Sequence, residues 1–205
     1  DEAAKAPIAL ATDLANNQHY EIDTSLYQQI LGTTLKYSGS YWTESSTGLD
    51  QADELTLKLY IQRADIHDFQ YILELGSGWG SLSLNIAEQF PNTKVTTVTN
   101  SVTQKAYIEG RIAELDLGNI SVVHADINDF HPTIEYDRII SIEMFEHLRN
   151  PAQLLRRIDK WLNPGGKLFI QVFSHRCYPQ FFDNIKTSTK FLGHSFNFPF
   201  LINLQ

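Results

Sequence analysis

A glycine-rich stretch between two segments of regular structure constrains this chain more than any other feature. Residues 72–80 read Ile-Leu-Glu-Leu-Gly-Ser-Gly-Trp-Gly, so an apolar run with one acid, Glu74, ends in three glycines at alternate positions. Residues 81–88 then have the pattern of a helix. Glycine permits positive φ and close approach of a ligand, and a helix N-terminus presents unpaired N–H donors. The stretch therefore predicts a strand, a loop and a helix start that hold a nucleotide-like cofactor.

Segments rich in Val and Ile alternate with helical segments from residue 70 onwards. We predict strands at 70–75, 94–99, 120–124, 136–142 and 167–173, and helices at 23–31, 50–66, 81–90, 101–117 and 151–162. Such alternation is typical of right-handed crossovers. The predicted fold class is therefore α/β, with a doubly wound, mostly parallel, Rossmann-like sheet. Ligands of such sheets bind at the carboxyl ends of the strands.

The chain divides into three predicted parts. Residues 1–69 form a helical lead-in, in which Asp50 is expected to cap the second helix. Its aromatic loop, residues 36–42, either packs on the core or forms a lid over the cofactor. Residues 70–175 form the sheet core, and residues 176–205 carry aromatic clusters without a clear period.

Composition and charge narrow the partners. The 205 residues carry a net charge of −8 with a pI near 5.3, which disfavours sequence-independent binding of nucleic acid or an anionic membrane. The lone Cys177 excludes an intrachain disulfide and suits a reducing compartment. No apolar run approaches the roughly 20 residues of a membrane span, and the start lacks a signal-peptide pattern. We expect a cytoplasmic protein with a small-molecule substrate and no stable membrane insertion, and the oligomeric state stays open.

The spacing of the glycines bears on which cofactor the loop binds. Gly76 and Gly78 belong to a G-x-G-x-G pattern, whereas dinucleotide-binding loops have G-x-G-x-x-G. Glu74, two residues ahead, would repel a pyrophosphate but attract a sulfonium or an ammonium group. A dinucleotide and S-adenosylmethionine both remain possible, and the carboxylate favours the cation.

Polar residues follow the next two predicted strands at the same edge. Asn100 can donate to and accept from ribose hydroxyls. Gln104 either binds a ligand or completes a capping box with Ser101. Asp126 either accepts from an adenine amino group or caps a turn.

Glu143, Glu146 and His147 follow the fourth predicted strand. If the chain is helical there, positions i, i+3 and i+4 place all three on one side. Methyl transfer to an amine requires alignment of the nucleophile and removal of its proton, which carboxylates and imidazole can perform. The alternatives are an acidic helix start with a partly buried His, or a metal site, for which the spacing of known zinc motifs is lacking.

These motifs together resemble a known family. Tyr37-Ser38, residues 74–80, residues 100–104, Ala125-Asp126-Ile127 and residues 141–147 are similar to S-adenosylmethionine-dependent methyltransferases of the cyclopropane-fatty-acid-synthase superfamily, most of all to its coclaurine N-methyltransferase-like branch. The resemblance implies a methyltransferase with S-adenosylmethionine as cofactor and no metal. It implies that Glu143 and Glu146 hold the ammonium and that His147 or Glu146 takes its proton. The implied cofactor site consists of Tyr37, Ser38, Gly76, Asn100, Gln104, Asp126 and Ile127.

Two departures from the family bear on the reaction. Cyclopropane synthases carry a Cys after Tyr-Ser and a His on the fifth strand, which help to bind bicarbonate, but Gly39 and Gln171 stand at these positions here. N-methylation of a small amine is therefore favoured over a fatty-acyl cyclopropane synthase or a lipid methyltransferase. The family pattern of a closing C-terminal hairpin is not found after Phe182, so the hairpin is missing or diverged. A third alternative is a cofactor-binding protein without turnover.

Overall fold

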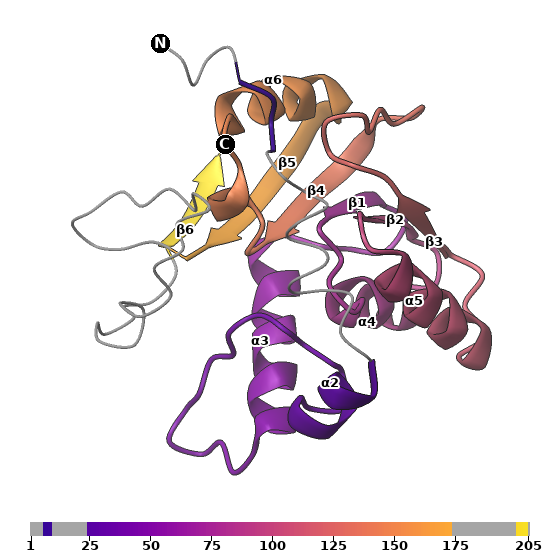
Figure 1. The fold of residues 1–205 in the computed structure, drawn as a ribbon, viewed down its shortest axis with the longest axis vertical. Coiled ribbons are helices and arrows are strands. Elements are labelled where there is room, and N and C mark those ends of the chain that lie inside the picture. The colour runs from indigo at the N-terminus through magenta and orange to yellow at the C-terminus, as the bar shows by residue number, and fades with distance from the viewer. Residues whose placement is uncertain (1–5, 10–23, 174–199, 205) are drawn as a thin grey trace.

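A computed structural model of the chain describes residues 6–9, 24–173 and 200–204. In chain order the elements are α2 (Thr24–Ile30), α3 (Leu49–Arg63), β1 (Tyr71–Leu75), α4 (Ser81–Gln89), β2 (Lys94–Thr99), α5 (Val102–Glu114), β3 (Ile120–His124), β4 (Tyr136–Ile142), η2 (Phe145–His147), α6 (Pro151–Trp161), β5 (Leu162–Val172) and β6 (Phe200–Leu204) (Figure 1). The predicted α/β alternation is confirmed over the described residues.

One six-stranded sheet organises these elements in the order β3-β2-β1-β4-β5-β6. The first five strands are parallel, and β6 runs antiparallel to β5. The central strand, β1, pairs with β2 on one side and with β4 on the other. The strand order reverses at this point, and ligands of doubly wound sheets bind at such a switch.

Each face of the sheet is covered by different helices. Alternate side chains of a strand point to opposite faces, so Leu73 packs with Leu154 and Ile158 of α6, whereas Ile72 packs with residues of α3 and α4. Figure 1 shows α6 on one side of the sheet and α3 and α4 on the other. Side chains are therefore buried on both faces of the central strands β1 and β4, as in other parallel sheets, whereas the edge strand β3 has no buried residue.

The start of α3 differs from the prediction. Its N-cap is Gly48, without a side-chain hydrogen bond, and Asp50 lies inside the first turn. The Asp50 carboxylate instead accepts from the N–H of Thr33, at 2.7 Å, and from its hydroxyl. Asp50 therefore joins α3 to the segment after α2 and does not cap the helix.

The C-terminal strand, β6, lies at the edge of the sheet beside β5. Residues 200–204 form β6, which pairs with residues 168–172 of β5. An antiparallel strand thus closes this edge of the sheet, while the predicted features between 174 and 199 lie outside the described residues. Within the described ranges, the helices are all too short or too polar to cross a membrane.

Candidate functional site

The carboxyl ends of the parallel strands meet at one edge of the sheet. Leu75 is in register with Val98, Thr99 with His124, and Ile142 with Gln171. Most of the predicted site residues follow these strands, whereas Glu74 lies within β1, and Tyr37 and Ser38 lie in the loop before α3. The topology therefore brings both predicted groups, for cofactor and for catalysis, to the same edge.

The glycine loop connects β1 to α4 with backbone conformations that favour glycine. Gly76, Gly78 and Gly80 have φ values of 83°, 50° and 81°. A Cβ on Gly80 would lie 2.9 Å from Ile108 of α5, whereas a Cβ on Gly78 would meet no atom of the described residues within 4 Å. Gly80 therefore permits close packing of α5, and Gly78 leaves its backbone open to a ligand. No side chain caps the N-terminus of α4, which starts at this loop.

Glu74 lies beneath this loop. Its side chain is only 3% exposed, and its carboxylate accepts from the hydroxyl of Thr97 on β2 at 2.8 Å. Burial raises the pKa of Glu74 to about 7, against the effect of hydrogen bonds from Thr97 and Ser83. The assignment of Glu74 to the cofactor's cation stays a prediction.

Gln104 of α5 lies beside the end of β2 and has an unpartnered side-chain donor. Its Oε1 accepts from the hydroxyl of Thr99 at 2.7 Å, while its Nε2 is buried and has no hydrogen-bond partner among the described residues. The hydroxyl of Ser101 caps α5 by accepting from the Gln104 N–H, as predicted. The reciprocal half of the capping box is absent, because the Ser101 N–H is bonded to Thr99. The side chain of Gln104 is thus available to a ligand that offers an acceptor.

The remaining cofactor candidates lie around the same edge. Asn100 directly follows β2, and its carbonyl is bonded to His124 at the end of β3. Asp126 accepts from the N–H of Asn128 at 2.7 Å, so it forms the predicted turn. Ile127 is half-buried beside Asp126. A role of Asp126 in binding adenine stays a prediction.

The aromatic loop, residues 36–42, is bonded to α3. Ser40 donates to Asp53, and the N–H of Tyr41 donates to Thr56 at 2.7 Å. The ring of Tyr37 is 47% exposed and packs edge-on against Tyr27 at 5.3 Å. The loop is thus packed on α3 while Tyr37 faces solvent, and a lid function stays a prediction.

Glu143 is held by donors from two distant segments. Its Oε1 accepts from the N–H of Gly39 at 3.2 Å and from Nε2 of Gln171 at 3.0 Å. Its backbone has φ of 52°, a left-handed conformation that is uncommon for a side chain of this size. Burial raises the pKa of Glu143, and Gly39, Gln171 and Lys36 oppose the rise. Gln171, noted in the sequence only as a departure, is therefore a direct partner of Glu143.

Glu146 has one bonded and one unpartnered oxygen. Oε1 accepts from the N–H of Phe173 at 3.3 Å, and Oε2 is buried without a partner in the described parts of the chain. Burial, and to a smaller extent the negative charge of Glu143, raise the pKa of Glu146 to about 7, while hydrogen bonds from the backbone of Glu146 and Phe173 oppose the rise. A buried carboxylate oxygen without a donor is costly, and it favours a ligand that supplies one.

The predicted helical placement of the catalytic candidates is wrong. The chain forms a single 3-10 turn at residues 145–147, and Glu143 precedes it in the left-handed conformation. Consequently the two carboxylates are partly buried near each other, whereas His147 is exposed. The structure brings Glu143 and Glu146 together, and a role for His147 stays a prediction.

Sequence reasoning missed Lys36, which lies in the same cluster. Its side chain is 3% exposed, and its ammonium binds oxygens of Ser38 and Gly39. The only sequence signal is its position beside Tyr37 and Ser38, because a lysine in a polar loop is ordinarily exposed.

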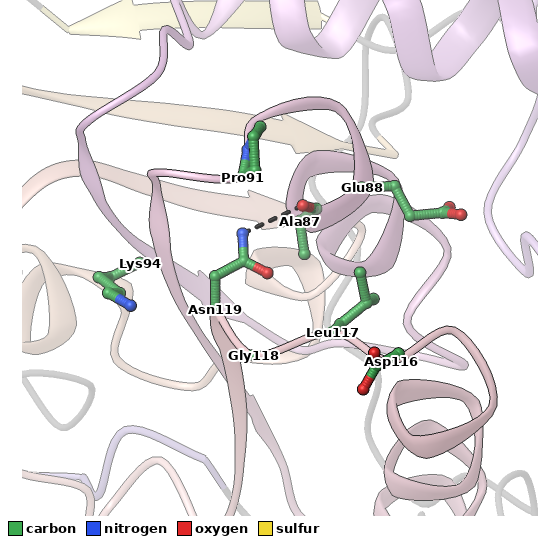
Figure 2. Close-up of a pocket in the computed structure, with 8 residues that line it drawn as sticks. All are labelled: Ala87, Glu88, Pro91, Lys94, Asp116, Leu117, Gly118 and Asn119. Carbon is green, nitrogen blue, oxygen red and sulfur yellow. Dashed lines mark hydrogen bonds between the residues drawn. The ribbon is translucent and has the colours of Figure 1, made fainter.

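A separate surface pocket of about 260 Å³ lies at the opposite edge of the sheet, near the amino ends of β2 and β3. Figure 2 shows Asn119 in this pocket, bonded to the carbonyl of Ala87 at the end of α4. This polar residue of the pocket therefore joins the end of α4 to the segment before β3. Among the described residues, no three His, Cys, Asp or Glu side chains are grouped to hold a metal ion.

The sequence pattern of the family described as mycolic acid cyclopropane synthetase matches residues 11–198. The chain belongs to this family. Within it, (S)-coclaurine N-methyltransferase of Thalictrum flavum subsp. glaucum is 36% identical over 189 residues, which cover 92% of this chain and 52% of that protein. Pavine N-methyltransferase of the same plant is 37% identical over 174 residues, covering 85% of this chain and 48% of that protein. Cyclopropane-fatty-acyl-phospholipid synthase of Escherichia coli (strain K12) is 28% identical, covering 75% and 39%.

Solved structures agree with the family assignment. Coclaurine N-methyltransferase bound to N-methylheliamine and SAH has a TM-score of 0.82 and 41% identity, and the match covers 85% of this chain and 50% of that one. The cyclopropane synthase MmaA2 from Mycobacterium tuberculosis has a TM-score of 0.72 at 23% identity, with 81% and 58% covered, and it shows the shared fold. The chain spans about half the length of the relatives it matches.

Proposed function

We propose that this chain is an S-adenosylmethionine-dependent methyltransferase that acts on a small amine. The observation that carries the proposal is the buried oxygen of Glu146, without a partner among the described residues, beside the carboxylate of Glu143. Two partly buried carboxylates at one site favour a cationic ligand, since a cation offsets both their desolvation and their mutual repulsion. An alkylammonium has this charge and supplies N–H donors.

The cofactor edge has features that suit S-adenosylmethionine. Within the part of the chain that the structure describes, Gly78 leaves its backbone open, and Gln104 has a buried donor without a partner. Such a donor fits a hydroxyl or carboxylate oxygen of the cofactor. Asn100 and Asp126 lie at the next two strand ends, and Tyr37 and Ser38 lie on the loop bonded to α3. The solved relative with SAH supports this choice of cofactor.

The proposed chemistry is a direct displacement. When bound, S-adenosylmethionine would supply an electrophilic methyl group to the amine nitrogen and would leave as the neutral thioether. Glu143 and Glu146 bind and orient the amine, and Glu146 or His147 accepts the amine proton. The raised pKa of Glu146, about 7, suits an acceptor of a proton near neutral pH.

Gly39 and Gln171 support the amine over a lipid substrate. Both donate to the same oxygen of Glu143, so they serve to fix the carboxylate that would bind the amine. The N-methyltransferase relatives also match at higher identity than the E. coli cyclopropane synthase. A second candidate is a cofactor-binding protein without turnover.

One experiment separates these candidates. The chain is incubated with S-adenosylmethionine carrying a labelled methyl group, and with either aromatic amines such as coclaurine or vesicles of unsaturated phospholipid. We expect label in the amine. Label only in lipid would reject the amine proposal, and calorimetric binding of the cofactor without label in any acceptor would support the protein without turnover.

A further inference from the structure

Lys36 is a buried cation in the loop that contacts Glu143. Its Nζ donates to the carbonyl of Ser38 at 3.0 Å, to the hydroxyl of Ser38 at 2.8 Å and to the carbonyl of Gly39. It also lies 5.4 Å from the centre of the Tyr60 ring, where a cation is stabilised. An ammonium has three N–H donors, and three loop oxygens accept them.

The peptide between Ser38 and Gly39 joins this cation to the candidate catalytic carboxylate. The peptide is trans, so its C=O and N–H point in opposite directions. The Ser38 carbonyl accepts from Lys36, and the Gly39 N–H donates to Oε1 of Glu143 at 3.2 Å. The negative end of the peptide dipole thus faces the ammonium, and its positive end faces the carboxylate.

Two simpler roles for Lys36 do not match this geometry. A lysine acting as a base needs a neutral amine with a free lone pair, but three acceptors face this nitrogen. A lysine that binds the substrate or cofactor directly needs an N–H donor that is not already bonded. The three loop oxygens already accept from all three N–H groups of this ammonium. Burial lowers the pKa of Lys36 to about 8, and Glu143 and Asp53 oppose the change, so Lys36 is still charged at pH 7.

We propose that Lys36 is a positioning residue for the methyl acceptor: by holding the Ser38–Gly39 peptide, it directs the Gly39 N–H at Glu143 and keeps that carboxylate charged and oriented. This inference rests on the proposed function only where it concerns the acceptor. The arrangement of charges around Glu143 can be tested without turnover.

The groups that face Glu143 set the sign of the expected effect. Gly39 and Gln171 donate to it, Lys36 attracts it from behind the loop, and the charge of Glu146 repels it. Tyr60, from α3, has its pKa raised by burial and stays neutral. Removing the charge of Lys36 therefore leaves two carboxylates close together with less compensation, so protonation of Glu143 becomes easier.

The first test follows the amide proton of Gly39 by NMR of the full 205-residue chain as the pH is varied. In the wild type its chemical shift should change as Glu143 ionises, and Glu143→Gln should abolish the change. In Lys36→Met the midpoint should rise by about one pH unit. Lys36→Arg should stay near the wild type, and Lys58→Met, which removes an exposed lysine of α3, is the matched control.

An unchanged midpoint in Lys36→Met would overturn the inference. If this variant does not fold by circular dichroism, Lys36→Gln replaces it, since an amide can still donate to Ser38. A folded Lys36→Gln with the wild-type midpoint would overturn the inference equally.

The second test applies where the wild type methylates an amine. Lys36→Met should raise KM for the amine by about tenfold or more at saturating cofactor. The calorimetric Kd of the cofactor is measured alongside, because Lys36 also binds Ser38 of the candidate cofactor site. An unchanged KM would overturn the role toward the acceptor. A wild type without transfer would reject the proposed function, while the NMR result would still decide the role of Lys36 toward Glu143.

Discussion

The two halves of the site edge are built in different ways. At the ends of β1, β2 and β3, the candidate cofactor residues other than Tyr37 and Ser38 lie within residues 74–127, close together in the sequence, and among the described residues they offer open backbone and an unpartnered donor. At the ends of β4 and β5, Glu143 is held by Gly39, 104 residues earlier, and by Gln171, 28 residues later. The cofactor half thus depends on local backbone geometry, whereas the acceptor half depends on long-range side-chain contacts.

The largest expected effect is in the acceptor half. Glu146→Gln keeps the shape of the side chain and removes its charge, so kcat/KM for an amine should fall by about 10²–10⁴-fold. In the wild type, kcat/KM should fall about tenfold per pH unit below about pH 7, because only deprotonated Glu146 binds a cation or accepts a proton. The control is Glu54→Gln, an exposed residue of α3. Wild-type kcat/KM in Glu146→Gln would remove Glu146 from the mechanism.

The next largest effect concerns Glu74, the buried carboxyl group of the cofactor half. Folding raises the pKa of Glu74 from 4.5 to about 7. Its contribution to stability is therefore full below about pH 4.5 and is lost as the pH rises to about 7. Glu74→Gln has no carboxyl group to titrate at this position. Its free energy of unfolding relative to the wild type should therefore increase by about 3 kcal/mol between pH 4 and pH 8.

Urea unfolding of both proteins across this pH range measures the difference. The exposed Glu135→Gln should show no comparable change with pH. If the free energies of unfolding of Glu74→Gln and the wild type changed with pH in parallel, the pKa of Glu74 would not be raised in the folded protein.

Two glycines separate folding from ligand binding within the cofactor half. Gly80→Ala should destabilise the fold by about 2–3 kcal/mol, because its Cβ meets Ile108 at a strained φ. Gly78→Ala should cost about 1 kcal/mol, since the space around it is open, but it should weaken cofactor binding. Thermal unfolding and calorimetry distinguish the two. Normal cofactor affinity in Gly78→Ala would show that the open backbone does not face the cofactor.

The last expected effect concerns cofactor affinity alone and the unpartnered donor of Gln104. Gln104→Met removes the Nε2 group, and the calorimetric Kd of the cofactor should rise about tenfold, the value of one hydrogen bond of about 1.4 kcal/mol. Gln62→Met, on the exposed face of α3, should bind as the wild type does. Equal affinity for all three proteins would place the Gln104 donor outside the cofactor site.

The same contrast explains what sequence could predict. Strand and helix patterns gave the parallel sheet, and the parallel sheet placed the residues after β1 to β4 at one edge. The cap formed by Ser101 was predictable, because both partners lie within one helical turn. Local sequence was therefore sufficient to predict where the residues after β1 to β3 lie, while their roles toward a cofactor stay predictions.

The acceptor half was less predictable for physical reasons. Asp53, Thr56 and Lys36 are polar but buried, because they bond to or within the loop, and α3 lacks a simple apolar stripe there. Asp50 was misassigned as a cap because its partner, Thr33, lies 17 residues away. The left-handed backbone of Glu143 interrupts the helical spacing assumed for residues 143–147. None of these contacts leaves a periodic signal.

The central place of β1 has a consequence for the order of folding. β1 and β2 lie in one βαβ unit, whereas pairing of β1 with β4 joins Glu74 to Ile140 across 66 residues. Closing a longer loop costs more chain entropy, so non-local pairing is slower. We expect the cofactor half to form first during refolding and the acceptor half to follow, and pulsed hydrogen exchange would show protection of β2 before β4. A newly synthesised chain would then acquire its cofactor edge before its two candidate catalytic carboxylates come together.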